Sequence, residues 1–196
     1  MDAQQPRDEE LLQRALAGEE QAFTLLYRRR QAGIYRFAFQ MSGSHPVAED
    51  VTQEVFLTLV RDGARYNPGR ASLAAYLYGI ARNLVLRWVE RQKPADIEAA
   101  GAIRSSSDPA GELERDESIR AVRLAVLALP AHYREVAVLC DLHEMAYEDA
   151  AAALGCAVGT VRSRLHRARG LLAEKLRLSG VGGPARGAAA PLRSCV

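Results

Sequence analysis

Apolar residues recur at helical spacing through almost all of residues 8–93, and this pattern limits the chain to a helical fold. One segment places four such residues at intervals of four, on one side of a helix: Val47, Val51, Val55 and Leu59. Composition agrees, because alanine and leucine dominate and aromatic residues make up only 6% of the chain. Sheets favour β-branched and aromatic residues instead. We therefore expect an all-α protein.

The helical pattern stops in one internal stretch and again near the C-terminus. Residues 96–114 are rich in Ala, Gly, Ser, Asp, Pro and Glu and have no apolar periodicity, which is typical of a flexible acidic linker. The pattern resumes over residues 115–177, and residues 178–196 read as a disordered tail rich in Gly, Ala, Pro and Arg. The sequence thus predicts two small helical domains, residues 1–95 and 115–177, joined by the linker.

Charge is segregated along the chain, although the net charge is only +2. Residues 61–95 and 157–177 each have a net charge of +5, and residues 96–118 between them have a net charge of −5. Each basic group that neutralises a phosphate releases counterions and adds affinity for nucleic acid. Two separate basic blocks therefore favour a protein that contacts nucleic acid in two places.

Other classes of protein find little support. The three cysteines, Cys140, Cys156 and Cys195, are odd in number and widely spaced, so a disulfide framework is not expected. No signal peptide or membrane-spanning run is evident, which indicates a cytoplasmic protein. The sequence also lacks a phosphate loop, a nucleophile elbow and metal-ligand spacing. We expect neither an enzyme nor a bound metal or cofactor.

The strongest local pattern is that of a helix-turn-helix, over residues 147–172. Gly155 can adopt the left-handed conformation that ends a short helix. Ala151, four residues earlier, leaves room for a second helix to cross closely. That second helix is expected to run from Val158 to Lys175. The small residues and their spacing match the requirements of the motif.

The two faces of this second helix differ sharply. At 100° per residue, four apolar residues form one narrow stripe that should be buried: Val161, Leu165, Ala168 and Leu172. The other face is polar and basic, and we expect it to contact DNA through Gly159, Thr160, Arg162, Ser163, Arg164, His166 and Arg167. A merely solvated basic helix is the alternative, but it does not explain the spacing of Ala151 and Gly155.

A second long helix is expected after a turn at residues 66–70. Ser72 is its candidate N-cap, as Asp8 is for the first helix of the chain. Its buried stripe is predicted to contain Leu73, Leu77, Ile80, Leu84 and Trp88. Since Arg82, Arg87 and Arg91 cannot all lie on that stripe, this helix should present basic groups outward, which makes it a second possible face for DNA.

Three segments of the chain resemble extracytoplasmic-function (ECF) sigma factors. The sequence AVGTVRSRLHRAR at residues 157–169 is similar to their C-terminal helix-turn-helix. AEDVTQEVFL at residues 48–57 resembles their polymerase-binding helix, and YLYGIARNL at residues 76–84 resembles their promoter-melting helix. The three segments occur in the family's order, with the linker between the second and the third.

The resemblance implies partners and contact residues. Core RNA polymerase would bind Asp50, Gln53, Glu54, Phe56 and Leu57. The minus-10 promoter DNA would bind Asn67, Arg70, Ser72, Arg82, Asn83 and Arg87, and the helix-turn-helix would bind the minus-35 element. An anti-sigma factor is a further expected partner. The chain departs from the family at Arg87, where an acidic residue is common, and at Ala146, which lacks a capping hydroxyl.

One alternative remains open on the residues alone. A stand-alone helix-turn-helix regulator would use only the C-terminal domain for DNA, and its residues 8–93 would sense a ligand or form a dimer. Neither a ligand pocket nor coiled-coil heptads are evident in that segment. Binding to core RNA polymerase distinguishes a sigma factor from such a regulator.

Overall fold

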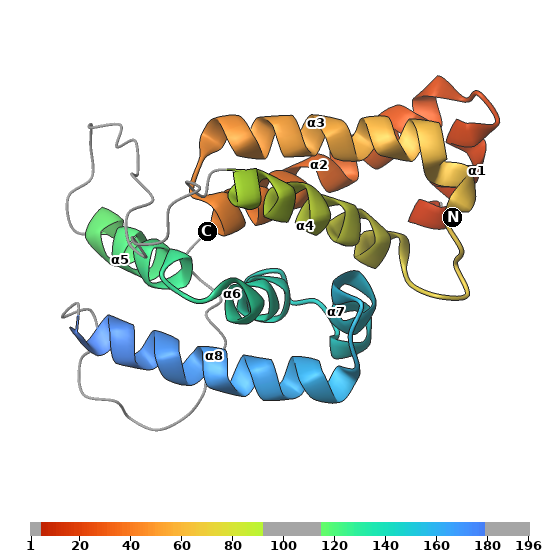
Figure 1. The fold of residues 1–196 in the computed structure, drawn as a ribbon. Helices are drawn as coiled ribbons and strands as arrows, with labels where there is room; N and C mark the ends of the chain where they lie inside the picture. Colours follow the sequence, from red (N-terminus) through yellow and green to blue (C-terminus); the bar gives the residue numbers. More distant parts are fainter. Residues whose placement is uncertain (1–4, 92–114, 179–196) are drawn as a thin grey trace.

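The computed structural model describes residues 5–91 and 115–178, and every regular element in these ranges is helical (Figure 1). The prediction of an all-α fold is confirmed. The predicted linker, residues 96–114, lies outside the described residues, as does the tail apart from Leu178, which still belongs to the last helix. The helices are α1 (Asp8–Leu16), α2 (Glu20–Ser42), α3 (His45–Asp62), the short η1 (Gly63–Arg65), α4 (Leu73–Arg91), α5 (Arg115–Leu127), α6 (Ala131–Ala137), η2 (Val138–Leu142), α7 (Tyr147–Leu154) and α8 (Val158–Leu178).

Helices α1 to α4 form the first unit, in which α2 and α3 lie side by side and α4 packs against both (Figure 1). Gly43 ends α2 with a φ of 71°, a left-handed conformation that suits glycine, and the chain turns back into α3. Ser72 is the N-cap of α4, as predicted, because its Oγ accepts a hydrogen bond from the backbone N–H of Ala75 at 3.2 Å. This cap fixes where the second predicted DNA-binding helix begins.

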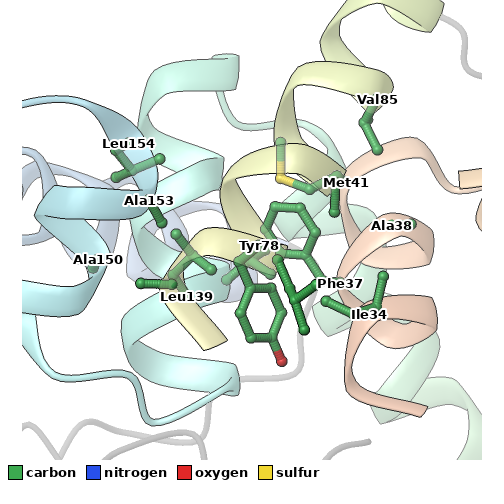
Figure 2. Close-up of a cluster of buried hydrophobic side chains, with 14 of the residues drawn as sticks. Ile34, Phe37, Ala38, Met41, Tyr78, Val85, Leu139, Ala150, Ala153 and Leu154 are labelled. Carbon is green, nitrogen blue, oxygen red and sulfur yellow. The ribbon is translucent and has the colours of Figure 1, made fainter. Parts of the chain in front are cut away.

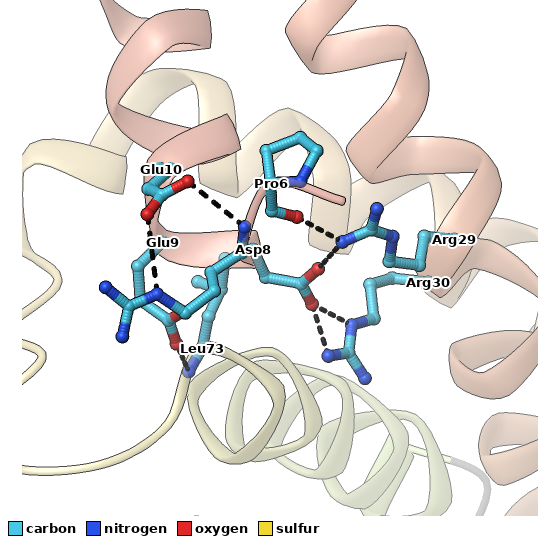
Figure 3. A network of polar contacts seen from close by, with 8 residues as sticks. Pro6, Asp8, Glu9, Glu10, Arg29, Arg30 and Leu73 are labelled. Carbon is cyan, nitrogen blue, oxygen red and sulfur yellow. Dashed lines mark hydrogen bonds and ion pairs between the residues drawn. The ribbon is translucent and has the colours of Figure 1, made fainter. Parts of the chain in front are cut away.

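Asp8 ties α1 to α2, which differs from its predicted role as an N-cap (Figure 3). Arg7 occupies the cap position, and the Asp8 side chain is only 7% exposed. Its carboxylate accepts a hydrogen bond from Arg29 at 2.8 Å and another from Arg30. Arg29 also donates to the carbonyl of Pro6 at 2.9 Å. The prediction was wrong because two arginines some twenty residues away compete successfully for the carboxylate.

The second unit, α5 to α8, contains a π-helix that the sequence pattern did not predict. This element, η2, directly continues α6 and changes the direction of the side chains that follow. Arg134 in α6 stabilises the end of α5, since its guanidinium donates to the carbonyls of Leu127 and Leu129, the latter at 3.0 Å. Burial of this guanidinium lowers the pKa of Arg134. The unit presents α8 along one edge of the molecule (Figure 1).

The two units pack on each other and share one hydrophobic core. Figure 2 shows one buried cluster to which both units contribute, with Tyr78 of the first unit next to Leu139 of the second, and with Phe37, Ala150 and Ala153 further out in the same cluster. The most extensive contact between the two units is that of α4 with α7. The sequence predicts two domains but contains no direct sign of this contact between them.

The contact explains why the predicted buried stripe of α4 was only partly correct. Leu73 and Leu77 are buried, whereas the other three predicted members are only half-buried: Ile80, Leu84 and Trp88. The remaining buried residues of α4 are Ala75, Tyr78, Ala81 and Val85. Because α4 is covered by α2 and α3 on one side and by α7 on another, its buried surface is wider than a single stripe.

Within residues 5–91 and 115–178, we find no helix with the length and apolar character needed to span a membrane.

Candidate nucleic-acid interface

The C-terminal helix-turn-helix forms as predicted. Helix α7 ends at Gly155, whose φ of 63° is left-handed, and α8 begins three residues later at Val158. No side chain caps the start of α7 at Ala146, in agreement with the missing hydroxyl. The buried residues of α8 are the four predicted ones, Val161, Leu165, Ala168 and Leu172. The remaining face of α8 is therefore set by the packing of this stripe.

That remaining face is polar and largely open to solvent. Gly159, Arg162, Ser163, His166 and Arg167 are exposed, and Thr160 and Arg164 are half-buried. No acidic residue lies in the first turn of α8. No carboxylate therefore neutralises the positive end of the helix dipole, and this favours binding of a phosphate group at the N-terminus of α8. All seven predicted residues of this surface lie on α8, and the exposed ones can reach a DNA groove.

Two contacts that sequence reasoning missed hold α8 and its arginines in place. Asp141 of η2 is 4% exposed and accepts two hydrogen bonds from Arg169, at 2.6 and 3.1 Å. This bidentate pair fixes α8 relative to the π-helix and raises the pKa of Arg169. The guanidinium of Arg162 lies 5.9 Å from the ring centre of Tyr147. The one sequence feature that hints at the Asp141–Arg169 pair is the position of Asp141, an acidic residue inside an otherwise apolar segment.

The second predicted DNA surface begins with an exposed loop. Asn67 accepts a hydrogen bond from the backbone N–H of Gly69 at 2.8 Å, which forms an Asx turn. The hydroxyl of Tyr66 donates to the carbonyl of Ala71 at 2.9 Å, and burial raises the pKa of Tyr66 to about 12. These bonds give the loop a defined shape, and they leave the side chain of Arg70 exposed.

The three predicted residues further along α4 differ in exposure. Asn83 and Arg87 are exposed, and Arg87 donates a hydrogen bond to the carbonyl of Asn83 at 3.3 Å. Arg82 instead faces the second unit, where its Nε lies 3.0 Å from a carboxylate oxygen of Glu135. Helix α4 therefore presents exposed basic groups at Arg87 and Arg91, whereas the side chain of Arg82 is directed to the second unit. An acidic residue more than fifty positions away attracts it.

Three of the predicted polymerase-binding residues, Gln53, Phe56 and Leu57, line an apolar groove between α2 and α3. The groove has a volume of about 780 Å³ and is lined by residues that include Phe23, Tyr27, Tyr35, Gln53, Leu57 and Val60. Leu57 and Val60 are 52% and 59% exposed, unusually high values for such apolar side chains.

The predicted residues around this groove differ in accessibility. Asp50 and Gln53 are exposed, and Glu54 is half-buried with a carboxylate oxygen 3.8 Å from Arg61. Phe56 is only 4% exposed and packs on Tyr27, with ring centres 4.7 Å apart. Phe56 was predicted as a contact residue, but it forms the floor of the groove.

Among the described residues, no cluster of His, Cys, Asp or Glu has the size needed to hold a metal ion. Cys140 and Cys156 are half-buried thiols, and burial raises the pKa of Cys140 to about 11. A thiol with so high a pKa is almost entirely protonated at neutral pH and is a poor nucleophile or ligand.

The fold and the exposed arginine face of α8 define a helix-turn-helix protein with a basic surface suited to DNA. Comparison with known families identifies both halves of the chain. The family model for Sigma-70 region 2 matches residues 26–94, and the model for Sigma-70 region 4 matches residues 119–172.

Individual relatives agree with this assignment. The chain is 35% identical over 148 residues to the ECF RNA polymerase sigma factor EcfG of Rhodopseudomonas palustris, covering 74% of this chain and 79% of that protein. It is 36% identical over 156 residues to the ECF RNA polymerase sigma factor SigE of Mycolicibacterium smegmatis, covering 77% of this chain and 60% of that protein. The chain therefore spans less than two thirds of SigE.

Solved structures show the same fold. The sigma factor RpoE of Bartonella quintana, in complex with the anti-sigma factor NepR, matches with a TM-score of 0.61 at 30% identity, covering 80% of this chain and 97% of that chain. CnrH, in complex with the cytosolic domain of CnrY, matches with a TM-score of 0.68 at 27% identity, covering 87% and 97%. The chain belongs to the ECF family of sigma-70-type RNA polymerase sigma factors.

Proposed function

We propose that the chain binds core RNA polymerase through the α2–α3 groove and directs it to promoters that α8 and α4 recognise. The observation that carries this proposal is the exposed basic face of α8, held by the Asp141–Arg169 pair opposite a buried apolar stripe. A stand-alone regulator would also have this face. The sigma-70 region 2 match in residues 26–94 and the open groove favour the polymerase-dependent function.

The groove suits a helical partner with apolar and basic side chains. Leu57 and Val60 offer exposed apolar surface. Asp50 is exposed on the same helix, α3, about two helical turns before Leu57 and about three before Val60. Apolar burial would supply affinity, and the acidic rim would set orientation. Core RNA polymerase is the proposed occupant, and an anti-sigma factor that competes for this surface is a further proposed partner.

The promoter contacts are divided between the two units. The exposed side chains of Arg162, His166 and Arg167 would read or clamp the minus-35 duplex. The loop with Asn67 and Arg70, followed by Asn83 on α4, would hold the opened minus-10 strand. The role is one of binding and positioning, without catalysis by the chain itself. The proposed location is the cytoplasm, where polymerase and DNA are found.

Transcription by purified components tests the function without a known promoter. Core polymerase, with and without the chain, is supplied with genomic DNA of the encoding organism, and the 5′ ends of the transcripts are sequenced. A sigma factor yields a set of new start sites that share two upstream elements. Start sites that do not depend on the chain would contradict the proposal.

A pair of variants tests the docking surface. Leu57→Asp places a charge in the groove and should weaken binding to core polymerase at least tenfold, because an apolar contact is replaced by a carboxylate that must be desolvated. Leu124→Asp is the matched control, since Leu124 is also exposed, at 47%, but lies on α5 in the other unit. Equal effects of the two substitutions on polymerase affinity would remove the groove from the proposal.

A further inference from the structure

A polar crevice lies where the middle of α2 meets the first turns of α4 and the loop that follows η2. Its volume is about 310 Å³, at the lower end of the range of about 300 to 1,000 Å³ that is typical of sites for small molecules. Three arginines of α2 line it, namely Arg29, Arg30 and Arg36. We propose that this crevice binds a small phosphate-bearing molecule of the size of a nucleotide or smaller. Its lining shares only Ala32 and Arg36 with the α2–α3 groove.

Two of the arginines have hydrogen-bond donors beyond those that the fold uses. Arg29 and Arg30 share the single carboxylate of Asp8 (Figure 3). These contacts, with the bond to the carbonyl of Pro6, use one nitrogen of Arg29 and two of Arg30. A guanidinium has five N–H donors. Both arginines therefore have further donors with which to bind an anion.

Arg36 adds a third positive charge, which acts on groups inside the crevice. After burial, it is the second cause that lowers the pKa of His143 to about 4, so this ring is neutral at pH 7. Burial raises the pKa of Tyr78, and the positive charges of Arg30 and Arg36 oppose this rise. A crevice with an excess of one sign of charge between apolar walls concentrates its field, and here the field attracts anions.

Glu144 lines the crevice from the second unit and has a strained backbone. Its φ of 52° is left-handed, and within residues 5–91 and 115–178 no other residue except glycine has a positive φ. Such strain costs about 1 to 3 kcal/mol and is concentrated at active sites and ligand-binding sites. The carboxylates of Glu144 and Asp8, set against the three arginines, leave one net positive charge around the crevice. Loss of the charge of Glu144 should therefore strengthen anion binding.

The other walls of the crevice define the class of ligand. Ile34 and Leu77 are buried and apolar, and Leu142 is half-buried. The planar fork of a guanidinium matches two oxygens of a phosphate, so three arginines favour a phosphate or pyrophosphate group. An uncharged ring attached to that group would lie against the apolar wall. A nucleoside phosphate combines these two parts.

The crevice suits a free molecule better than the backbone of a duplex. The side chains of Arg29 and Arg30 are only 27% and 35% exposed, so a phosphate must enter the crevice to reach them. Both units contribute walls, with Leu142 to Glu144 coming from the second unit. A ligand held by both units stabilises the folded chain and should raise its unfolding temperature.

Equilibrium dialysis of labelled inorganic pyrophosphate against the full chain, at constant ionic strength, tests the site. Arg36→Gln should weaken binding roughly tenfold, because a charge-assisted hydrogen bond is lost. Arg28→Gln is the matched control: Arg28 is also an exposed arginine of α2 but does not line the crevice, and its loss should change the affinity less than about twofold. Glu144→Gln should strengthen binding roughly threefold, because a repelling charge is removed.

Three results would overturn the site. They are no binding of pyrophosphate to the wild-type chain in the millimolar range, equal effects of Arg36→Gln and Arg28→Gln, and weaker binding by Glu144→Gln. The opposite directions expected for Arg36→Gln and Glu144→Gln separate a specific site from loss of folding, which would weaken binding in both.

Competition for the labelled pyrophosphate defines the ligand class. Adenosine 5′-monophosphate should displace it, and succinate at the same ionic strength should not, because a phosphate group presents more oxygens to the arginine forks. Displacement by a short DNA duplex that depends on Arg36 would assign the crevice to a nucleic-acid backbone and overturn the small-molecule ligand. The assay contains neither polymerase nor promoter, so its outcome is independent of the function proposed above.

Discussion

His143 should make the contact between the two units sensitive to pH. Its imidazole is enclosed by the first unit, with ring centres 5.2 Å from Tyr78 and 6.1 Å from Phe37. This burial, with a smaller effect of the positive charge of Arg36, lowers the pKa of His143 to about 4, from an ordinary value of 6.5. Neutral histidine can donate from Nε2 to Gln40 and accept from Tyr78 at Nδ1, which satisfies both bonds.

The sign and size of the effect follow from this pKa. A depressed pKa means that packing of the two units favours the neutral ring, so its contribution is fully present above pH 6.5 and is lost as the pH falls from 6.5 to 4. If separation of the units restores the ordinary pKa, their packing is weakened by about 2 kcal/mol at pH 5, or roughly 30-fold in the ratio of packed to separated molecules. Acidification should therefore favour separation of the two units.

Energy transfer between dyes on the two units measures this separation. Thr24→Cys and Glu174→Cys provide exposed positions on α2 and α8, in a variant whose native cysteines are replaced (Cys140→Ala, Cys156→Ser, Cys195→Ser). Transfer efficiency should change between pH 6.5 and 4.5 in the direction of separation. His143→Gln can still form hydrogen bonds but does not titrate, so its transfer should be flat over this range. The reasoning is refuted if the His143→Gln profile is as steep as that of wild type.

Four further substitutions test the functional surfaces and the contacts that position them. Asp141→Asn should lower the free energy of unfolding, measured with urea, by only about 1 kcal/mol because its arginine partner is 45% exposed, yet it should weaken promoter binding by loosening α8. Arg162→Ala or Arg167→Ala should each cost about 1–3 kcal/mol of binding to the minus-35 duplex in a gel-shift titration if the arginine contacts a base, with unfolding unchanged. Asp8→Asn should reduce the free energy of unfolding by about 2 kcal/mol, because the partly buried Arg29 and Arg30 lose the carboxylate with which they pair. A change smaller than about 0.5 kcal/mol would contradict the structural role of these ion pairs.

Local patterns predicted the helix-turn-helix well. The stripe Val161, Leu165, Ala168 and Leu172 is set by helical periodicity alone, and all four residues are buried. Gly155 adopts the left-handed conformation that its position after α7 requires. Such features depend on residues within one or two helical turns, and a sequence contains that information directly.

Contacts between distant segments were not predictable in the same way. Helical periodicity places Arg82 and Arg169 outside the apolar stripes of their helices. It does not predict that Arg82 pairs with Glu135 or that Arg169 pairs with Asp141. Asp8 is similar, because its arginine partners lie in the next helix. One sequence does not reveal which of several carboxylates an arginine will meet after folding. Side-chain pairing therefore limited the prediction of the site more than helix assignment did.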